Sequence, residues 1–269
     1  MMRSLWTAAS GMKTQQVTVD TIANNLANVN TVGYKKERME FKSLLYETIR
    51  EAGSVDQGGS PVNLQVGHGV FTAGSVKTFT QGNLERTEGP LDFAISGGGF
   101  FAIQNPDGDV QYTKDGSFKM SLYDGSLVLA TVNGYPVLGT DGQPLTFENG
   151  TNPSNLSVDE FGNFTTVVDG EAVDLGVQMQ MVQFNNVTGI KALGGGLYEE
   201  TVASGEPLLE SENPDLETSS LTQGMLESSN VQAVEEMVKM IIAQRAYELS
   251  SKAIQTSDDM LSTANNLKR

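Results

Sequence analysis

Residues 22–35, which read IANNLANVNTVGYK, close a segment with a seven-residue repeat. One row of the repeat contains Leu5, Met12, Val19 and Leu26. A second row, offset by three residues, contains Ala8, Gln15, Ile22 and Val29. Two rows with this offset are the a and d positions of a coiled coil, and Gly33 after Asn30 is a helix-stop signal. The pattern predicts a helix over residues 3–30 with an apolar seam that needs a partner.

The charge of the 269-residue chain is distributed unevenly. The formal net charge is −16, and residues 51–225 hold 5 Lys or Arg against 23 Asp or Glu, whereas both ends are nearly neutral. An acidic chain has no electrostatic affinity for nucleic acid or for an anionic membrane surface. The absence of Cys excludes disulfides and thiolate metal sites. Neither a membrane span nor a cleaved signal peptide is expected, because no apolar run is long enough.

Glycine and proline divide the chain in the same way. All 8 Pro and all Gly except Gly11 and Gly33 lie within residues 51–225. Residues 51–63, with Pro61, are expected to form a loop, and from Leu64 the apolar residues recur with a period of two. Asp-Gly begins at residues 107, 115, 124, 141 and 169, and Asn-Gly at residues 133 and 149. These dipeptides favour tight hairpin turns, so the middle is predicted to be mostly antiparallel β structure.

The strand candidates between these turns are short. They cover residues 93–95, 100–103, 110–113, 126–131, 135–138, 156–158, 164–168 and 176–184. Residues 34–50 are ambiguous: they could form a second helical stretch or extend along a neighbour. Residues 197–226, with Pro207 and Pro214, are expected to lead back to the C-terminal segment.

The C-terminal segment after Ser228-Ser229-Asn230 contains no Gly or Pro, and these three residues are a candidate helix N-cap. One stripe at helical spacing contains Val231, Val234, Val238, Ile241, Arg245, Leu249 and Lys252. A second contains Met237, Met240, Tyr247, Ile254 and Leu261. Two stripes indicate a helix that contacts more than one neighbour.

The predicted fold class is α+β, with two long terminal helices that pair as a coiled-coil-like stem around a central, mostly antiparallel β domain. The expected divisions are residues 1–63 and 227–269 for the stem and residues 64–226 for the β domain. One intramolecular partner cannot cover the apolar stripes of both helices. We therefore expect the terminal helices to pack against other copies of the chain and to become ordered on assembly.

Three stretches carry a family resemblance. Residues 22–35 resemble the N-terminal signature of the bacterial flagellar rod and hook family, residues 228–261 resemble its C-terminal signature, and residues 89–125 are similar to its β domain. Residues 3–16, 41–53 and 64–70 are most similar to the distal-rod branch of that family, and the proximal-rod and hook branches are the near alternatives.

The resemblance implies a structural, non-enzymatic subunit whose helices form the inner core of a tubular rod, with the β domain outside. It implies a homopolymer in the flagellar basal body, outside the cytoplasmic membrane, which contacts other rod proteins and the hook protein. It also implies passage through the flagellar export apparatus and transmission of torque. No cofactor, nucleic-acid partner or direct membrane insertion is expected.

The candidate site is a subunit interface rather than a catalytic, cofactor or metal site. Its expected residues are Leu5, Met12, Val19, Ile22, Asn24, Asn25, Leu26, Asn28, Val29, Val234, Val238, Ile241, Gln244, Arg245, Tyr247, Ile254 and Leu261. The asparagines either face solvent or form inter-subunit hydrogen bonds that fix the register, and the family resemblance favours the second reading. Arg245 either covers apolar surface with its head in water or pairs with a neighbouring helix.

Other motifs favour ordinary structural roles. His68 is the only histidine, which makes a histidine-based metal or nucleophile site improbable. Gly97-Gly98-Gly99 lacks the lysine of a phosphate loop and is expected to form a turn or bulge. The main alternative to a rod subunit is a secreted β-domain binding module whose helices only oligomerise it.

Overall fold

The computed structural model of the chain describes residues 2–52, 62–123, 125–148, 152–168, 171–213 and 216–267. The expectations that involve Pro61, Asp124, Asn149, Asp169 and Pro214 lie outside these residues. The chain forms two compact units. Unit 1 contains Met1–Ala27, Glu37–Lys77 and Gln232–Arg269, and unit 2 contains Asn28–Lys36 and Thr78–Val231.

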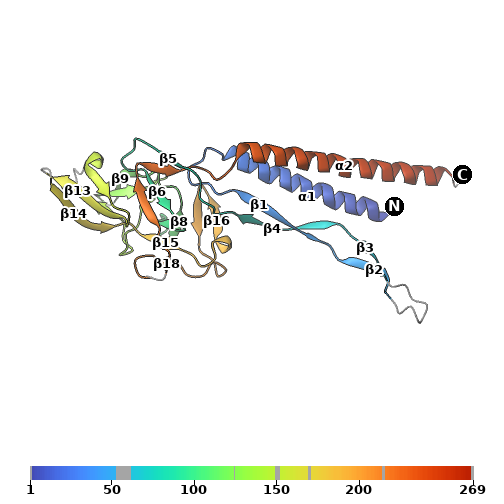
Figure 1. Cartoon of the computed structure of the whole chain (residues 1–269), viewed down its shortest axis with the longest axis horizontal. Coiled ribbons are helices and arrows are strands. Elements are labelled where there is room, and N and C mark those ends of the chain that lie inside the picture. Colours follow the sequence, from blue (N-terminus) through green and yellow to red (C-terminus); the bar gives the residue numbers. More distant parts are fainter. Residues whose placement is uncertain are drawn as a thin grey trace. The chain divides into compact units, whose positions relative to one another are not determined.

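Unit 1 contains the two long helices that the sequence predicts. Helix α1 (Met2–Ala27) and helix α2 (Ala233–Asn266) lie side by side (Figure 1). Serine and threonine are frequent in α1, and their hydroxyl groups bond carbonyls of the preceding turn, as Thr14 does to Ser10 O at 2.8 Å. The helix predicted over residues 3–30 is therefore present, but it ends at Ala27, three residues earlier than expected. Gly33 lies six residues later, with φ +65° in a turn.

The N-cap expected at Ser228-Ser229-Asn230 is also wrong. Helix α2 begins at Ala233, and its N-cap Gln232 makes no side-chain capping hydrogen bond. The side chain of Asn230 instead bonds other segments of unit 2. Glu235 and Glu236 lie in the first turn, where carboxylates interact favourably with the positive end of the helix dipole.

The other strands of unit 1 that the structure describes form a pair of two-stranded ribbons (Figure 1). Strand β1 (Glu37–Ser43) pairs with β4 (Val70–Lys77), and β2 (Tyr46–Arg50) pairs with β3 (Leu64–Gly67), both antiparallel. Residues 34–50 therefore do not form the second helix that was one of the two expectations. Charged and apolar residues alternate from Arg38 to Lys42, which is the period of a strand.

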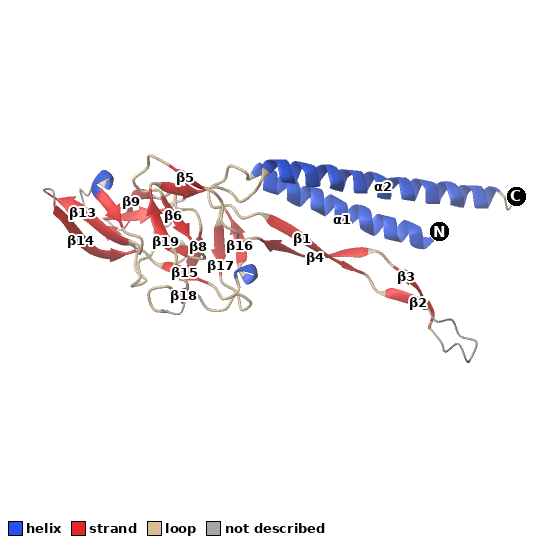
Figure 2. Ribbon diagram, viewed as in Figure 1, coloured by secondary structure: helices blue, strands red, loops and turns tan. Residues whose placement is uncertain are grey.

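The regular secondary structure of unit 2 is mostly short antiparallel strands, which are joined by loops and turns (Figure 2). Its six-stranded sheet has the order β16 (Lys191–Gly194), β17 (Leu197–Glu199), β8 (Val110–Thr113), β7 (Phe100–Gln104), β15 (Met181–Gln183) and β18 (Leu208–Leu209). One three-stranded sheet contains β11 (Thr146–Phe147), β10 (Ser126–Ala130) and β9 (Lys119–Tyr123). Another contains β12 (Leu156–Val158), β13 (Asn163–Val168) and β14 (Glu171–Gln178). The two long helices of unit 1 and the antiparallel strands of both units confirm the predicted α+β fold class.

Two strand pairs and two helical turns complete unit 2. Strand β6 (Phe93–Ser96) pairs with β19 (Ser220–Gln223), and β5 (Leu84–Arg86) pairs with β20 (Met225–Glu227). The 3-10 turns are η2 (Pro153–Asn155) and η3 (Val187–Gly189). The strand expected at residues 135–138 is wrong, since these residues form only isolated bridges. Pro136 has no N–H group to continue a ladder.

Strand β7 is the centre of the unit 2 core. Successive residues of a strand face opposite sides of its sheet. Phe100 accordingly belongs to one hydrophobic cluster, with Tyr112 and Phe184, while Phe101 belongs to a second and larger cluster. The ring centroids of Tyr112 and Phe184 are 4.9 Å apart with an edge-on geometry. Because both faces of β7 are buried, its sequence is a continuous apolar run rather than an alternating one.

Candidate subunit interface

The first half of helix α2 carries an exposed apolar face. Val234 is 70% exposed, Ile241 58% and Ile242 63%. The spacing of the exposed apolar residues is that of one helix face. Those in the first three turns are Val234, Met237, Val238, Ile241 and Ile242. A contiguous exposed apolar face is typical of a surface that another protein covers.

The opposite face of α2 packs against α1 within the same chain. Ala243 and Ser257 are buried there, and the hydroxyl oxygens of Ser4 and Ser257 lie 3.2 Å apart. A Cβ atom added to Gly11 would lie 3.4 Å from Ser250 Oγ, which is ordinary van der Waals contact. Small side chains thus allow the two helices to approach closely. The small residues of α2 face α1, and its large apolar residues lie on the opposite side of the helix. These large residues therefore remain outside the contact with α1.

A shallow groove brings three of the expected interface residues together. Val19 of α1 and Gln244 and Tyr247 of α2 line it, along with Gln16 and Glu248. Its lining combines the apolar surfaces of Val19 and Tyr247 with three polar side chains. The helix pair therefore offers both an apolar face and an adjacent groove.

The other expected interface residues are distributed between the surface and the interior. Val238 and Asn24 are exposed, and Ile22 is buried. The half-buried residues are Leu5, Met12, Leu26, Asn28, Val29, Ile254 and Leu261. The apolar members of that group retain part of their surface for a further neighbour.

Asn25 is engaged by its own chain. It is 2% exposed, its Nδ2 donates to Glu37 O at 2.8 Å, and its Oδ1 accepts from Glu37 N at 2.9 Å. The amide thereby takes the place of a neighbouring strand at the start of β1. Nδ2 also lies 3.4 Å from Glu236 Oε2 on α2. One asparagine thus links α1, β1 and α2, a role that its position in the heptad pattern did not indicate.

Arg245 points into solvent and pairs along its own helix. Its Nη1 lies 2.9 Å from Glu248 Oε2, three residues further on, and both side chains are largely exposed. An exposed pair of this kind contributes little stability. The guanidinium group lies on the same side of α2 as Ile241, since the two residues are four positions apart.

The β ribbons add an apolar surface that the sequence-based site did not include. Its exposed residues are Phe41, Leu44, Leu45, Tyr46, Ile49, Leu64 and Phe71. A two-stranded ribbon has two unpaired edges and is marginally stable alone. The alternation in residues 38–42 was the available signal for a strand, but nothing in it indicated that the apolar side would remain uncovered.

Helix α1 supports this ribbon. Arg3 forms an ion pair with Glu47 of β2, and Val70 N donates to Ser10 Oγ at 3.3 Å. Gly69 has φ +109°, and any Cβ atom there would collide with Ser10. Tyr46 lies directly opposite Gly67, and its ring covers that glycine. These contacts fix the ribbon on the helix while its apolar side chains stay exposed.

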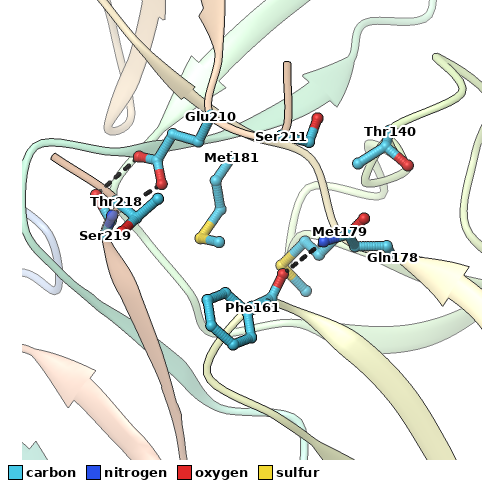
Figure 3. Close-up of a pocket in the computed structure, with 9 residues that line it drawn as sticks. All are labelled: Thr140, Phe161, Gln178, Met179, Met181, Glu210, Ser211, Thr218 and Ser219. Carbon is cyan, nitrogen blue, oxygen red and sulfur yellow. Dashed lines mark hydrogen bonds between the residues drawn. The ribbon is translucent and has the colours of Figure 1, made fainter. Parts of the chain in front are cut away.

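A cavity in unit 2 is too small for a typical organic ligand. It has a volume of about 60 Å³, and Phe161, Met179, Met181 and Glu210 are among the residues that line it (Figure 3). Ligand pockets usually have about 300–1,000 Å³. The Glu210 carboxylate turns toward Ser219 and accepts hydrogen bonds from its N and Oγ, both at 2.8 Å (Figure 3). The carboxylate is thus occupied by structural hydrogen bonds.

Two further properties concern the residues that the structure describes. Among them, no group of three or more His, Asp or Glu side chains is placed to hold a metal ion. No helix in the same part of the chain is long and apolar enough to cross a membrane.

Family models match three parts of the chain. The model described as Flagella basal body rod protein matches residues 5–35, and the Flagellar hook protein FlgE/F/G D1 domain matches residues 94–180. The Flagellar basal body rod FlgEFG protein C-terminal model matches residues 222–267. The helix pair and the strand-rich unit 2 are thus those of a protein of the bacterial flagellar rod and hook.

Full-length relatives narrow this class. A protein of Borreliella burgdorferi named flagellar basal-body rod protein FlgG is 46% identical over 274 residues, covering 100% of both chains. A Bacillus subtilis protein of the same name is 38% identical over 274 residues, again covering 100% of both chains. The Bacillus subtilis flagellar hook-basal body complex protein FlhP is 30% identical over 277 residues with the same coverage. The chain belongs to the family of flagellar basal-body rod proteins and is a structural protein of the flagellar basal body.

Proposed function

We propose that the chain is a non-enzymatic subunit of the distal rod, which polymerises through its terminal helices into a helical tube that transmits torque to the hook. The observation that carries this proposal is the exposed apolar face of α2 around Ile241. Fully burying a large aliphatic side chain contributes about 1.5–3 kcal/mol, so covering five half-exposed ones contributes about 1 kcal/mol each. Repeated in every subunit, such contacts stiffen a tube.

The stem of the subunit is proposed to be coiled-coil-like. Half-buried Leu5, Met12 and Val19 of the heptad row, with α2 beside α1, support this pairing. We propose residues 1–63 and 227–269 as the stem and residues 64–226 as the outer domain. The acidic middle of the chain keeps the monomer soluble and forms the outer surface of the tube.

The proposed partners follow from this place in the rod. They are further copies of the chain, other rod proteins on one side, the hook protein on the other, and the export apparatus that delivers the subunit. The relatives named as basal-body rod proteins support the assembly partners. The subunit needs no cofactor, nucleic acid or direct membrane insertion.

A charge substitution on α2 tests the assembly surface. Ile241→Glu should abolish tube formation by the purified chain, because a carboxylate would be buried without a partner. Ala264→Glu is the matched control, since it adds the same charge to an exposed residue of the same helix that lies on a different face from Ile241. Electron microscopy and sedimentation measure assembly, and circular dichroism reports whether the helices are intact. Tubes of normal length from Ile241→Glu would contradict the proposal.

Two alternatives predict different assemblies. A proximal-rod or hook paralogue would also polymerise, but deleting its gene would stop the basal body at another level; the relationship to FlhP keeps this alternative open. A secreted binding module would form closed oligomers such as trimers. Electron microscopy of concentrated protein separates tubes from discrete particles, and images of basal bodies from a deletion strain separate the paralogues.

A further inference from the structure

We infer that Asn230 and the buried Lys35–Glu227 pair are positioning residues that join three chain segments into one rigid collar within unit 2. The collar consists of residues 33–36, 78–83 and 227–231. The chain passes between its two units after residues 27, 36, 77 and 231, so each collar segment adjoins such a passage. The inference concerns the isolated chain and is independent of the proposed assembly.

The amide of Asn230 joins two of these passages. Its Oδ1 accepts from Lys36 N at 2.7 Å, and its Nδ2 donates to Thr78 O at 2.8 Å and Thr80 O at 3.1 Å. Lys36 and Thr78 are themselves bonded, with Thr78 N donating to Lys36 O at 2.9 Å. Asn230 N lies 3.4 Å from Tyr34 O. The Asn230 side chain therefore forms hydrogen bonds with backbone groups of both other segments, close to the points where the chain passes between the two units.

The Lys35–Glu227 pair fastens the same three segments from inside. Lys35 Nζ lies 2.5 Å from Glu227 Oε1, and the two side chains are 1% and 2% exposed. Nζ also donates to Thr80 O at 3.0 Å, and Oε1 accepts from Gly82 N at 2.7 Å. Each charged group therefore bonds its partner and the 78–83 segment.

Backbone hydrogen bonds complete the collar. Gly33 N donates to Glu227 O at 2.8 Å, and Ser228 N donates to Asn83 O at 2.8 Å. Each of the three segments is therefore hydrogen-bonded to both of the others. Apolar contacts are non-directional, so they stabilise a fold without fixing how its segments are aligned. A buried polar network is satisfied in one alignment of the segments, and other alignments leave polar groups without hydrogen bonds. The collar therefore prevents one segment from sliding while the others stay in place.

If the collar is rigid, loss of one of its hydrogen bonds should also change amide exchange elsewhere in the collar. If its hydrogen bonds are independent, only the amide that loses its partner should change. Asn230→Ala removes the acceptor of the Lys36 amide, so that amide must exchange faster in either case. In a rigid collar, the Gly82 and Ser228 amides also exchange faster, although neither is bonded to Asn230. The coupling must be reciprocal, so Glu227→Gln should accelerate exchange of the Lys36 amide.

Amide hydrogen exchange of the full chain measures this. We expect a rise of about tenfold or more at Lys36, Gly82 and Ser228 in Asn230→Ala, and in the milder Asn230→Asp and Glu227→Gln variants a smaller rise at the same amides. Asn186→Ala is the matched control, because Asn186 makes similar side-chain hydrogen bonds elsewhere in unit 2. The β7 amides report opening of the whole unit.

The outcomes separate clearly. Joint acceleration in the collar with unchanged exchange in β7 supports the inference. Acceleration at Lys36 alone would overturn it, because the hydrogen bonds would then act independently. An equal rise in β7 in all three variants would also overturn it, because the segments would then open only with the entire unit.

Discussion

At the scale of the residue, Gly33 shows why a glycine is required in the Asn-rich stretch. Its φ of +65° is a conformation that other residues adopt at a cost, and an added Cβ atom would lie 2.8 Å from both Asp115 N and the carbonyl carbon of Lys114. The backbone of residues 114–115 cannot move aside as a side chain would. Gly33 is therefore both a turn residue and a close-approach residue.

The matched comparison is between Gly33→Ala and Gly142→Ala. Gly142 has φ +73°, but nothing lies within 4 Å of an added Cβ atom. The strain of positive φ costs about 1 kcal/mol at either site, and the collision should cost Gly33→Ala a further 1–3 kcal/mol or so. Thermal or denaturant unfolding monitored on unit 2 gives both values. Equal losses would show that the contact with residues 114–115 is relieved without cost.

Lys114 provides a second test at this scale, through pH. It is 4% exposed, its Nζ donates to Gly97 O at 2.9 Å, and the ammonium lies 5.0 Å from the centre of the Phe100 ring. Burial, with a smaller contribution from Lys35, lowers the pKa of Lys114 to about 8 from 10.5. Between these pH values the unfolded chain binds more protons than the folded one. The free energy of unfolding should therefore rise with pH across this window.

The rise attributable to Lys114 is about 3 kcal/mol at most. Lys114→Met should remove it, whereas Lys119→Met, which changes a largely exposed lysine of the same unit, should leave it in place. Denaturant titrations from pH 7.5 to about 9.5 suffice. Higher pH brings an opposite effect, because burial, reinforced by Glu200, raises the pKa of Tyr112 to about 12, so stability falls as the unfolded tyrosine ionises. A wild-type curve parallel to that of Lys114→Met would contradict the prediction.

At the scale of the element, the β ribbons of unit 1 present apolar side chains on a scaffold too thin to bury them. Leu45, between β1 and β2, is 89% exposed. Leu45→Asp should leave the stability of the monomer unchanged within about 0.5 kcal/mol and should reduce tube assembly, because the ribbon side chains would be covered only in the polymer. Val202→Asp, at a fully exposed valine of unit 2, is the control and should assemble normally. The critical concentration for assembly is the quantity to compare, and equal values for both variants would exclude a role for the ribbon.

Elements with strong local signals were predictable from the sequence. Strands β8 and β12 have the predicted bounds, because turn dipeptides or a proline punctuate the chain around them. The two terminal helices follow from their periodicity. The strand at residues 135–138 was wrong because Pro136 interrupts the ladder, and the start of α2 was wrong because Asn230 is bonded to distant segments.

The candidate site was less predictable for a related reason. Periodicity identifies an apolar helix face such as that of Val234 and Ile241, but it does not say which face the chain itself covers. The links made by Asn25 and by Lys35 with Glu227 depend on pairings between residues far apart in the sequence. Lys35 and Glu227 both lie in the nearly neutral ends of the chain, and net charge does not indicate that these two charges are buried together.

At the scale of the whole molecule, the two units differ in how much apolar surface they bury. Both large hydrophobic clusters lie in unit 2, whereas the helices of unit 1 leave apolar faces uncovered. Stability of the monomer should therefore come mainly from unit 2, and assembly mainly from unit 1. This division predicts that the two properties can be separated by truncation.

A chain that ends at Gln232 tests that division. It lacks α2 but keeps Val231 and all the segments of unit 2. The near-ultraviolet circular dichroism of the aromatic clusters and their melting temperature should stay close to those of the full chain, since Phe93, Phe100 and Phe101 pack within unit 2. The truncated chain should remain monomeric at concentrations where the full chain forms tubes, as measured by sedimentation. If the truncated chain forms tubes, α2 is not required for assembly. If the aromatic signal is lost, unit 2 cannot fold without α2.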